Sequence, residues 1–430
     1  MVWVAGAEAR ILFRRRGYTP HFAEYVEDPV SGEEVVVMAD PHSRRSAFIY
    51  DPVKNKILWE FRVPGESLTA NPHIARMATE RISGFKARPG DVLCADLDNR
   101  FIVVDRVKKT VRWSFRPDDA KWSHDFMPTR DLQDMLTTDY STGYLRRINA
   151  EGRVLWSVNL GKGLAKLSRI SGNTPSRIHG NSFGGDVLAA VNQAYRGVYE
   201  VDEGRGSIAW SCPPPRGSKN CFFTLKPHSA VRLGLAELGG NLTVFNHEAG
   251  GGFVAVDKDC RPRWGVMKPF AVVGGDEVYR PSSTGLFETT HVFLTPHGLV
   301  GIIDWDGPDY STVYELLQPP PRTSLYWLLA WRRKASTTPE FLDPPVESGE
   351  WRETAFQAVN HGQNRMRVDF YTTLSPLADT VDSSLWRLAC TLRVEGGGVE
   401  ETVVSACSSI RVAVSSEGDT TYSLYVVNRA

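Results

Sequence analysis

Residues 177–210 read RIHGNSFGGDVLAAVNQAYRGVYEVDEGRGSIAW, and this stretch decides the fold. A histidine stands beside Asn181 near its start, and a Gly-Gly turn leads into the apolar run from Asp186 to Val191. A second apolar run, Gly197 to Asp202, follows, and after a glycine-rich turn a third run ends in Trp210. Short apolar runs separated by glycine-rich turns are typical of antiparallel β-strands. The stretch therefore predicts one small sheet with a polar, histidine-bearing leading edge.

Two markers repeat along the chain with a common period. The first is a histidine after a short polar or proline-containing lead-in, and successive copies are 52, 51, 55 and 49 residues apart. These histidines are His21, His73, His124, His179 and His228. The second marker is an apolar run ending in Asp or Asn, then a turn, then a run carrying Trp. Its copies pair Asp51 with Trp59, Asp105 with Trp113, Asn149 with Trp156, Asp202 with Trp210 and Asp257 with Trp264, and a weaker copy pairs Asp304 with Tyr314.

A four-stranded unit that repeats about every 50 residues predicts a β-propeller blade, because one small sheet cannot bury both of its faces alone. We expect the tryptophans to pack between neighbouring blades. Six units fill residues 18–318, so the sequence predicts an all-β chain with a six-bladed β-propeller over residues 1–318. Residues 1–17 resemble the last two strands of a blade and either close the ring or add an outer strand.

The prolines at 319–321 end the repeats, since consecutive prolines cannot continue a sheet ladder. Residues 322–430 do not continue the repeat pattern. We interpret residues 337–349 as a loop before the core of this segment. Strand-like runs follow at residues 365–374, 384–394, 401–415 and 420–428. They predict an antiparallel, sandwich-like β-domain over residues 322–430. We expect this domain to contact a protein partner or to mediate self-assembly.

The composition excludes some classes of partner. The chain has 50 Lys and Arg against 50 Asp and Glu, so no excess charge predicts binding to nucleic acid or to an anionic membrane. The most apolar segment, residues 324–331, is far shorter than the ~20 residues that cross a bilayer, so we expect no membrane span. The N-terminus lacks the order of features of a signal peptide, which leaves the compartment open.

The six cysteines form no C-x-x-C pair, and Cys212 and Cys221 are either free or bridged across the loop between them. No acidic residue accompanies the leading histidines at a fixed spacing, which argues against a metal site. We predict no metal and no organic cofactor.

The first strand of each propeller blade lines the central channel, so the leading histidines should converge near one axis. Converging imidazoles have three possible roles. They ligate a metal, they act as nucleophile and acid–base groups, or they satisfy strand-edge hydrogen bonds in a polar channel. The residues alone leave these roles open.

One family adds to this interpretation. His179-Gly-Asn181-Ser182-Phe, then a strand, Asn192-Gln193 and VYEVDEGRGSIAW, resembles the core repeat of the arylsulfotransferase family of six-bladed propellers. The following unit, KPHSAVRLGLAELGGNLTVFNHE, and the WSHDF around His124 are similar to further histidine motifs of that family. The resemblance covers about residues 20–318. The chain carries Val191 where the family usually has an arginine.

The resemblance implies a reaction and its residues. His228 would attack the sulfur of an aryl sulfate and hold the sulfuryl group for transfer to a phenol, without metal or organic cofactor. His179 and His124 would hold the sulfate oxygens and assist proton transfer to the leaving phenol. The expected substrate-binding residues are Asn181, Asn192, Gln193, Arg196, His73 and Lys226. The resemblance also suggests an exported protein.

The sequence is compatible with two alternative functions. In the first, the propeller is non-catalytic, and the chain is a structural or binding protein of a surface, filament or virion that works through its C-terminal β-domain. In the second, the histidine ring binds a metal or a quinone.

Overall fold

A computed structural model describes residues 2–4, 7–63, 71–97, 100–117, 122–170, 180–192, 197–212, 227–235, 240–248, 252–260, 262–266, 271–273, 276–278, 288–307, 309–318, 325–347, 353–373, 386–405 and 409–429. The regular elements in these residues are the β-strands β1 to β35, which confirms the predicted all-β class. Within the described ranges, no helix has the length and apolar character needed to span a membrane.

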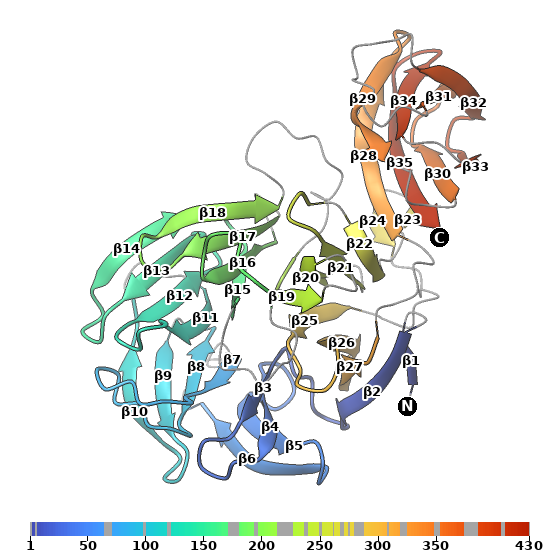
Figure 1. The fold of residues 1–430 in the computed structure, drawn as a ribbon. Helices are drawn as coiled ribbons and strands as arrows, with labels where there is room; N and C mark the ends of the chain where they lie inside the picture. Colours follow the sequence, from blue (N-terminus) through green and yellow to red (C-terminus); the bar gives the residue numbers. More distant parts are fainter. Residues whose placement is uncertain are drawn as a thin grey trace. The chain divides into compact units, whose positions relative to one another are not determined.

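The chain divides into two compact units (Figure 1). The first contains β1 to β21 and β25 to β27, and the second contains β23, β24 and β28 to β35. The sheets of the first unit are antiparallel, and each of five of them, as described, has four strands that follow one another in the chain.

The bounds of these strands follow the predicted repeat. The first sheet holds β3 (Phe22–Glu27), β4 (Glu34–Asp40), β5 (Ser46–Asp51) and β6 (Lys56–Arg62). The second holds β7 (Pro72–Met77), β8 (Val92–Asp96), β9 (Phe101–Asp105) and β10 (Thr110–Phe115). The third holds β11 (Ser123–Pro128), β12 (Met135–Asp139), β13 (Tyr144–Ile148) and β14 (Val154–Asn159). The fourth holds β15 (Leu164–Arg169), β16 (Val187–Val191), β17 (Gly197–Asp202) and β18 (Ser207–Cys212). The fifth holds β19 (Ala230–Leu235), β20 (Gly240–His247), β21 (Gly252–Val256) and β22 (Pro262–Val266).

The N-terminal segment completes a sixth sheet. Its order is β25 (Thr289–Phe293), β26 (Val300–Gly307), β27 (Tyr310–Leu316), β2 (Ala7–Arg14) and β1 (Val2–Val4). The antiparallel pairing of β2 with β27 joins the two ends of the first unit in one sheet. β2 therefore supplies the fourth strand, and β1 adds a fifth.

The first strands of these six sheets contact one another in a closed circle. β3 contacts β7, β7 contacts β11, β11 contacts β15, β15 contacts β19, β19 contacts β25, and β25 contacts β3 again. Figure 1 shows these strands nearest the centre, with the later strands of each sheet farther out. This arrangement of small antiparallel sheets is consistent with a β-propeller.

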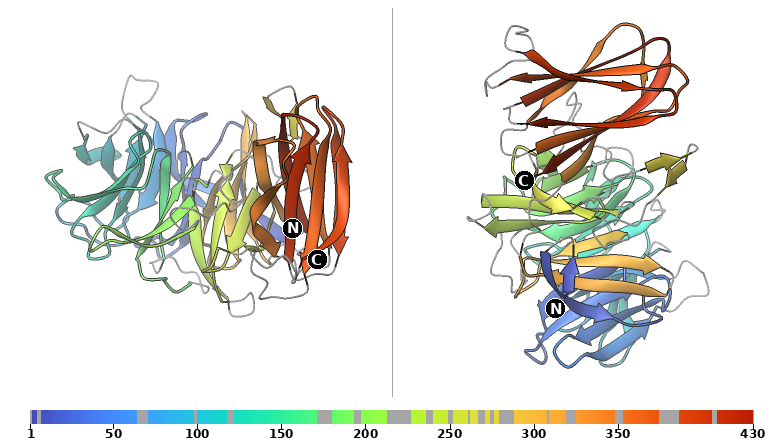
Figure 2. Two further views of the ribbon diagram at one scale, coloured as in Figure 1. Left: turned by 90° about the horizontal axis from the view of Figure 1, so that it is seen from above. Right: turned by 90° about the vertical axis from the view of Figure 1, so that its right-hand side faces the viewer.

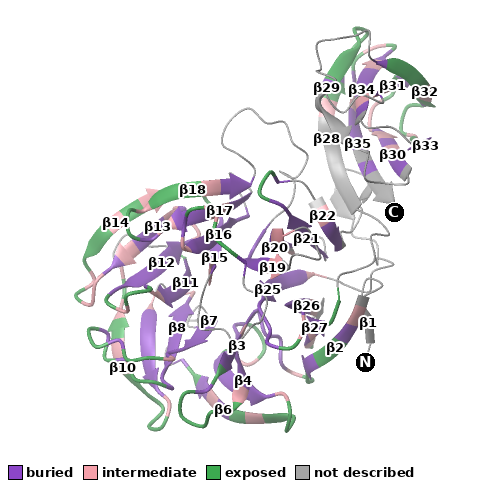
Figure 3. Ribbon diagram, viewed as in Figure 1, coloured by how far each residue is buried: buried purple, intermediate pink, exposed green. Residues whose placement is uncertain are grey.

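Burial follows the same radial order (Figure 3). Every residue of β7, β8 and β9 is buried, whereas the outer strand β10 has only exposed and half-buried residues. The first three strands therefore build the core, and the fourth strand faces solvent on its outer side. The continuous apolar composition of the middle strands is the sequence signature of this double-sided burial.

Consecutive sheets are joined by a repeated tryptophan contact. Each indole Nε1 donates a hydrogen bond to the carbonyl oxygen of the residue that follows the hairpin Asp or Asn of the next sheet. The pairs are Trp59 with Arg106, Trp113 with Ala150, Trp156 with Glu203 and Trp210 with Lys258, at 2.8, 3.2, 3.0 and 2.7 Å. The tryptophans thus pack between neighbouring sheets, as the sequence predicts.

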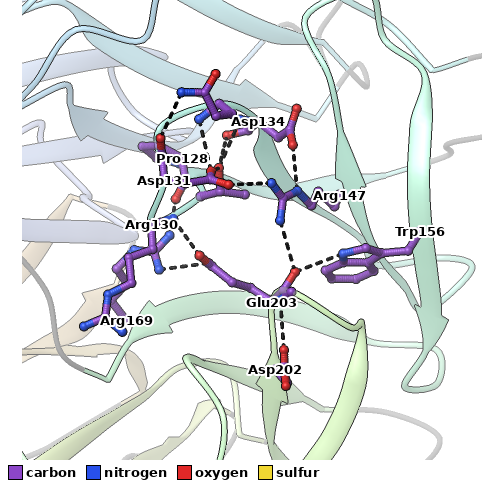
Figure 4. Close-up of polar contacts among 12 residues, drawn as sticks. Pro128, Arg130, Asp131, Asp134, Arg147, Trp156, Arg169, Asp202 and Glu203 are labelled. Carbon is purple, nitrogen blue, oxygen red and sulfur yellow. Dashed lines mark hydrogen bonds and ion pairs between the residues drawn. The ribbon is translucent and has the colours of Figure 1, made fainter.

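Charged side chains reinforce one of these joints (Figure 4). The Glu203 carboxylate accepts hydrogen bonds from the backbone N–H of Arg130 and from the guanidinium of Arg169, at 2.6 and 2.9 Å. Arg147 forms ion pairs with Asp131 and Asp134 of its own sheet. The Trp156 indole and these groups together hold the third and fourth sheets at a fixed spacing.

The hairpin Asp residues have a local role. The Asp105 carboxylate accepts hydrogen bonds from the backbone N–H groups of Val107 and Lys108, and Asp202 accepts equivalent bonds from Gly204 and Arg205. An Asp that bonds the N–H groups two and three residues ahead stabilises a tight turn. The repeated Asp of the sequence therefore sets the turn that receives the tryptophan of the preceding sheet.

The fourth sheet differs from the prediction in its first strand. The sequence pattern gave that place to the segment carrying His179, but β15 (Leu164–Arg169) pairs with β16 in the structure. His179 itself lies outside the described residues, and residues 180–186 form no strand. The histidine period skips this strand because the fourth inner position holds Lys166 instead of histidine.

The second unit contains two four-stranded antiparallel sheets and the hairpin β23 (Ala271–Val273) and β24 (Asp276–Val278), among the residues described. One sheet holds β28 (Leu325–Ala335), β35 (Thr420–Arg429), β30 (Glu353–Asn360) and β33 (Val399–Ser405). The other holds β29 (Glu340–Glu347), β34 (Ser409–Ser416), β31 (Met366–Thr373) and β32 (Arg387–Val394). Figure 2 shows the two sheets facing each other, and the buried rings of Phe356 and Phe370 meet with centroids 4.5 Å apart.

The predicted loop at residues 337–349 is wrong over its centre, because β29 occupies Glu340–Glu347. Two prolines, Pro344 and Pro345, made this segment read as a loop. β29 is an edge strand, and its pairing with β34 is irregular between Leu342 and Val346. Prolines are tolerated at an edge or an irregular register because no ladder N–H is needed there.

The turn glycine at Gly206 permits a direct stability test. Its φ is +65°, and a Cβ there would lie 2.7 Å from the Trp156 ring. Gly206→Ala should lower the free energy of unfolding by about 3 kcal/mol, through left-handed backbone strain plus the clash. Urea unfolding followed by tryptophan fluorescence measures this loss.

Gly32→Ala is the matched control. Gly32 has a φ of +72°, but no atom lies within 4 Å of the added Cβ. Only the backbone strain remains, at about 1–2 kcal/mol. Equal losses of unfolding free energy in the two variants would contradict close packing of the Trp156 indole against Gly206.

Candidate functional site

The inner strands begin with irregular pairing that repeats from sheet to sheet. The register of the first strand against the second breaks between Pro72 and Ile74, between Ser123 and Asp125, between Leu164 and Leu167, and between Thr289 and His291. The residues inside these breaks include His73, His124, Lys166 and Thr290. A β-bulge re-aims a side chain, and bulges are common beside active sites. Here the bulges bring polar side chains together where the inner strands begin.

Four of the predicted leading histidines lie in one cluster. His73 contacts His21 and His124 with ring centroids 4.5 and 4.0 Å apart, and His21 contacts His228 at 4.7 Å. The distance between the His124 and His228 centroids is 5.5 Å. The four rings are buried, with exposed fractions between 1% and 8%. The predicted convergence is therefore observed for His21, His73, His124 and His228, and we call these residues the histidine cluster.

The protonation of His228 follows from its neighbours. Its Nδ1 lies 2.9 Å from the carbonyl oxygen of Thr290, which only accepts hydrogen bonds, so Nδ1 carries the proton. The Nε2 atom of the neutral ring then has a lone pair. It faces a carboxylate oxygen of Glu248 at 3.6 Å.

Glu248 is held by a chain of polar contacts. The Asn192 amide donates to Glu248 at 2.7 Å, and the Tyr140 hydroxyl donates to the Asn192 side-chain oxygen, also at 2.7 Å. The Tyr140 ring stacks on His124 with centroids 4.3 Å apart. The predicted site residue Asn192 thus belongs to the cluster, through contacts that link His124 to His228.

Lys166 is the buried amine of the site. Its side chain is fully buried, and its Nζ atom donates to the carbonyl oxygens of His21 and Thr290. Burial holds the pKa of Lys166 well below its usual range, while the carboxylates of Glu248 and Asp125 act in the opposite direction. Lys166 occupies the place in the fourth sheet that histidines occupy in its neighbours.

The histidines are neutral at pH 7. Burial lowers the pKa of His21, His73 and His228 well below the usual value, and Lys166 lowers each of them further. Burial followed by the charge of Lys166 lowers the pKa of His124 to about 3. Neutral imidazoles offer lone pairs to an electrophile or a metal, and their N–H groups hold oxygen atoms, but they do not supply protons as imidazolium ions.

Two groups mark the side of the cluster that solvent reaches. The Glu248 side chain is 23% exposed, and Trp122 is 42% exposed. The Trp122 ring lies against both His124 and Tyr140, with centroids 5.8 and 5.1 Å apart. An aromatic surface therefore borders the histidine cluster.

Asn181 lies in a different setting from the histidine cluster. It is exposed, its backbone N–H donates to the Asn241 side chain, and its carbonyl oxygen accepts from Arg232. Arg232 and Glu200 form a fully buried ion pair at 2.6 Å, and Arg232 covers the Phe183 ring at 3.6 Å. Glu200 also accepts hydrogen bonds from the backbone of Phe183 and Gly185. The motif that most resembles the arylsulfotransferase repeat is thus anchored by a structural ion pair.

Four predicted site residues lie outside the described residues, namely His179, Gln193, Arg196 and Lys226. The same is true of Cys221, the suggested partner of Cys212. The structure therefore places His228, His124, His73 and Asn192 together, and Asn181 beside Arg232.

Sequence reasoning missed Lys166, Glu248 and Tyr140, and it left His21 out of the site although His21 is a leading histidine. A signal for Lys166 was present, since a lone lysine interrupts the apolar pattern of LAKLSRI at a strand start. Glu248 and Tyr140 come from loops and strand ends with no periodic pattern, so only the fold brings them to the histidines.

A small cavity lies farther along the same inner strands. Its volume is about 120 Å³, and its lining includes Phe22, Met127, Val231 and His291. Arg76 at its wall is fully engaged, with ion pairs to Asp125 and Glu24.

Comparison with known proteins supports the fold at a coarse level. The family model of the outer membrane protein assembly factor BamB matches residues 2–211, a little under half of the chain. Together with the circle of four-stranded sheets, this match supports a β-propeller and does not single out the arylsulfotransferase family. No curated protein sequence matches the chain.

Three solved structures match the chain at low sequence identity. Virginiamycin B lyase from Staphylococcus aureus is 11% identical with a TM-score of 0.41, covering 66% of this chain and 77% of its own. A protein of unknown function from Bacteroides caccae is 14% identical with a TM-score of 0.37, over 57% and 81%. U3-55K is 11% identical with a TM-score of 0.44, over 69% and 77%.

The low pKa of His124 predicts a pH dependence of stability. Between pH 6.5, the ordinary histidine value, and about 3, the unfolded chain binds a proton at His124 that the native chain does not. Stability therefore falls as the pH drops, and this residue contributes about 1.4 kcal/mol per pH unit. His124→Gln should reduce the slope of unfolding free energy against pH by that amount, as measured by urea unfolding between pH 6 and pH 4.

Tyr140→Phe is the control, because it keeps the ring stacked on His124 and removes only the hydroxyl. The slope of its unfolding free energy against pH should equal that of the parent protein. An unchanged slope in His124→Gln would show that His124 titrates normally in the folded protein.

Proposed function

We propose that the first unit is a six-bladed β-propeller enzyme that transfers a sulfuryl group from an aryl sulfate to a phenol through His228. The observation that carries the proposal is the fixed protonation of His228, whose Nδ1–H donates to the Thr290 carbonyl so that Nε2 presents a lone pair. The circle of six inner strands supports the propeller, and the resemblance of the fourth and fifth units to the arylsulfotransferase repeat supports the substrate. The second unit is, in this proposal, a β-sandwich.

In the first step, the Nε2 lone pair of His228 forms a bond to sulfur and the bond from sulfur to the aryl oxygen breaks. The aryl oxide leaves with that bonding pair, and water supplies its proton. The ring now carries the sulfuryl group on Nε2 and a proton on Nδ1, so it bears a positive charge. The Thr290 carbonyl and the Glu248 carboxylate stabilise that charge, because both lie within 4 Å of the ring.

In the second step, a phenol replaces the aryl oxide. Glu248 accepts the phenol proton, the phenol oxygen bonds to sulfur, and the bond from sulfur to Nε2 breaks. The electron pair of that bond returns to His228 as its lone pair. Glu248 then returns the proton to solvent, where it neutralises the hydroxide left when water protonated the aryl oxide. Asn192 and Tyr140 orient the Glu248 carboxylate for this transfer.

Lys166 takes the electrostatic role that the arylsulfotransferase family gives to an arginine. The family arginine position is Val191, which is buried in β16 and pairs with Leu164, two residues before Lys166. A buried ammonium group stabilises the negative charge that develops on sulfuryl oxygens more strongly than an exposed one. The neutral His73 and His124 add N–H donors, and Trp122 offers a face to the aromatic ring.

Incubation with an aryl sulfate tests the reaction directly. The parent protein should release phenol and gain the mass of one sulfuryl group, which peptide mapping locates on His228. His228→Ala should lose the adduct and lower kcat by at least about 10³-fold, because the nucleophile is absent. His297→Ala is the control, since that histidine is half exposed and lies outside the cluster.

Absence of both adduct and turnover in the parent would overturn the transferase proposal. It would favour the alternative that the chain is a non-catalytic structural or binding protein. Pull-down with the full chain before and after blocking of residues 322–430 by an antibody would then test the role of the second unit.

Lys166→Gln tests the charge in the same reaction. The neutral amide keeps a donor for the carbonyls of His21 and Thr290 but removes the cation. We expect kcat/KM for an aryl sulfate to fall about 10- to 100-fold, the loss typical of one transition-state contact. An unchanged kcat/KM would contradict the role assigned to Lys166.

A further inference from the structure

We infer that His21, His73 and His228 form a binding site for one divalent transition-metal ion of the zinc, cobalt or nickel class. One ring nitrogen from each of these buried histidines lies within 4.8 Å of the others. The three residues come from sheets separated along the chain, so the fold and not local sequence brings them together. Imidazole nitrogen is a preferred ligand of these ions.

The ring of His228 is already oriented as a ligand. Metal-bound histidines commonly donate their other ring N–H to a carbonyl or carboxylate oxygen, which fixes the nitrogen that faces the metal. The Nδ1–H of His228 donates to the Thr290 carbonyl in this way, which leaves the lone pair of Nε2 for a metal ion.

The ring of His73 provides a second, independent indication. Its Nδ1 atom is buried and has no hydrogen-bond partner among the described residues. Leaving a buried polar nitrogen unpaired is unfavourable by about 1–3 kcal/mol. A metal ion or its bound water would satisfy that nitrogen.

The geometry requires a small closure of the cluster. A zinc–nitrogen distance of about 2.1 Å in tetrahedral coordination places ligand nitrogens about 3.4 Å apart. The ligand nitrogens of His21, His73 and His228 lie within 4.8 Å of one another, so rotation of the side chains has to bring them closer on binding. Three protein ligands leave a fourth position for water, near the Glu248 carboxylate.

The surrounding charges set the affinity. Glu248 offsets part of the positive charge of an ion, whereas the buried Lys166 opposes it. Removal of the Lys166 charge should therefore tighten metal binding, although the same change weakens transfer from an anionic aryl sulfate. The opposite signs separate the two activities.

The metal site does not rest on the proposed transfer reaction, but the two share His228. An ion bound to Nε2 occupies the lone pair that would attack sulfur, so metal binding and sulfuryl transfer exclude each other. Zinc should inhibit the transfer reaction, and a chelator should restore it.

Titration of the full-length protein, without a histidine tag and after treatment with EDTA, tests the site. Zn²⁺ and Co²⁺ are added separately and followed by calorimetry and, for Co²⁺, by visible absorption. We expect one ion per chain, and a loss of affinity of at least about 100-fold in each of His21→Ala, His73→Ala and His228→Ala. Lys166→Gln should bind the ion about 10-fold more tightly, a gain that unfolding cannot produce.

Two controls separate the site from other imidazoles. His291→Asn changes a buried histidine outside the triad, and His297→Ala changes an exposed one, and both should keep the parent affinity. The proposal is overturned if binding persists in His73→Ala and His228→Ala, or if it is lost with His297→Ala. Binding of one ion with no sulfuryl adduct after EDTA treatment would overturn only the transferase proposal.

Discussion

The tryptophan contact between consecutive sheets is the interaction on which the first unit depends. A four-stranded sheet has two apolar faces, and each face is covered only if the next sheet stands at a fixed distance and angle. The indole supplies both requirements, because its ring fills the space between sheets and its N–H bonds one particular backbone carbonyl, as in Trp59 with Arg106 and Trp210 with Lys258. A purely apolar residue would fill the space without fixing the register.

The histidine cluster inherits its geometry from these joints. Its members come from different sheets, and no two of them are close in the sequence. The bulges at the strand starts aim the side chains inward, but only a fixed spacing between sheets keeps the rings within contact distance. The outer edge of the structure, where the tryptophans lie, therefore determines the positions of groups at its centre.

The sequence predicts the repeat well because the repeat has a local cause. The Asp of each hairpin makes its own turn, and the Trp follows at a short interval, so both recur visibly at Asp105 with Trp113 and at Asp202 with Trp210. The first strand of the fourth sheet could not be predicted in this way. Its inner position holds Lys166, whereas the histidine period continues at His179, which lies later in the chain. The residues after His179 are held by the buried ion pair of Arg232 and Glu200. This contact joins distant segments and leaves no periodic pattern in the sequence. Glu248 and Tyr140 could not be predicted for the same reason. The edge strand β29 was missed because Pro344 is typical of a loop.

The pairing of β2 with β27 has a consequence for the order in which the chain acquires its structure. Residues Ala7–Arg14 are synthesised long before their partner Tyr310–Leu316, which emerges some three hundred residues later. Closure of so long a loop loses chain entropy, and contacts of high sequence separation form slowly. The N-terminal strand must therefore wait as an unpaired edge during most of synthesis, and such edges are prone to pair with other chains. Charged side chains on a strand edge oppose such pairing, and Arg10 and Arg14 through Arg16 lie in and directly after this strand.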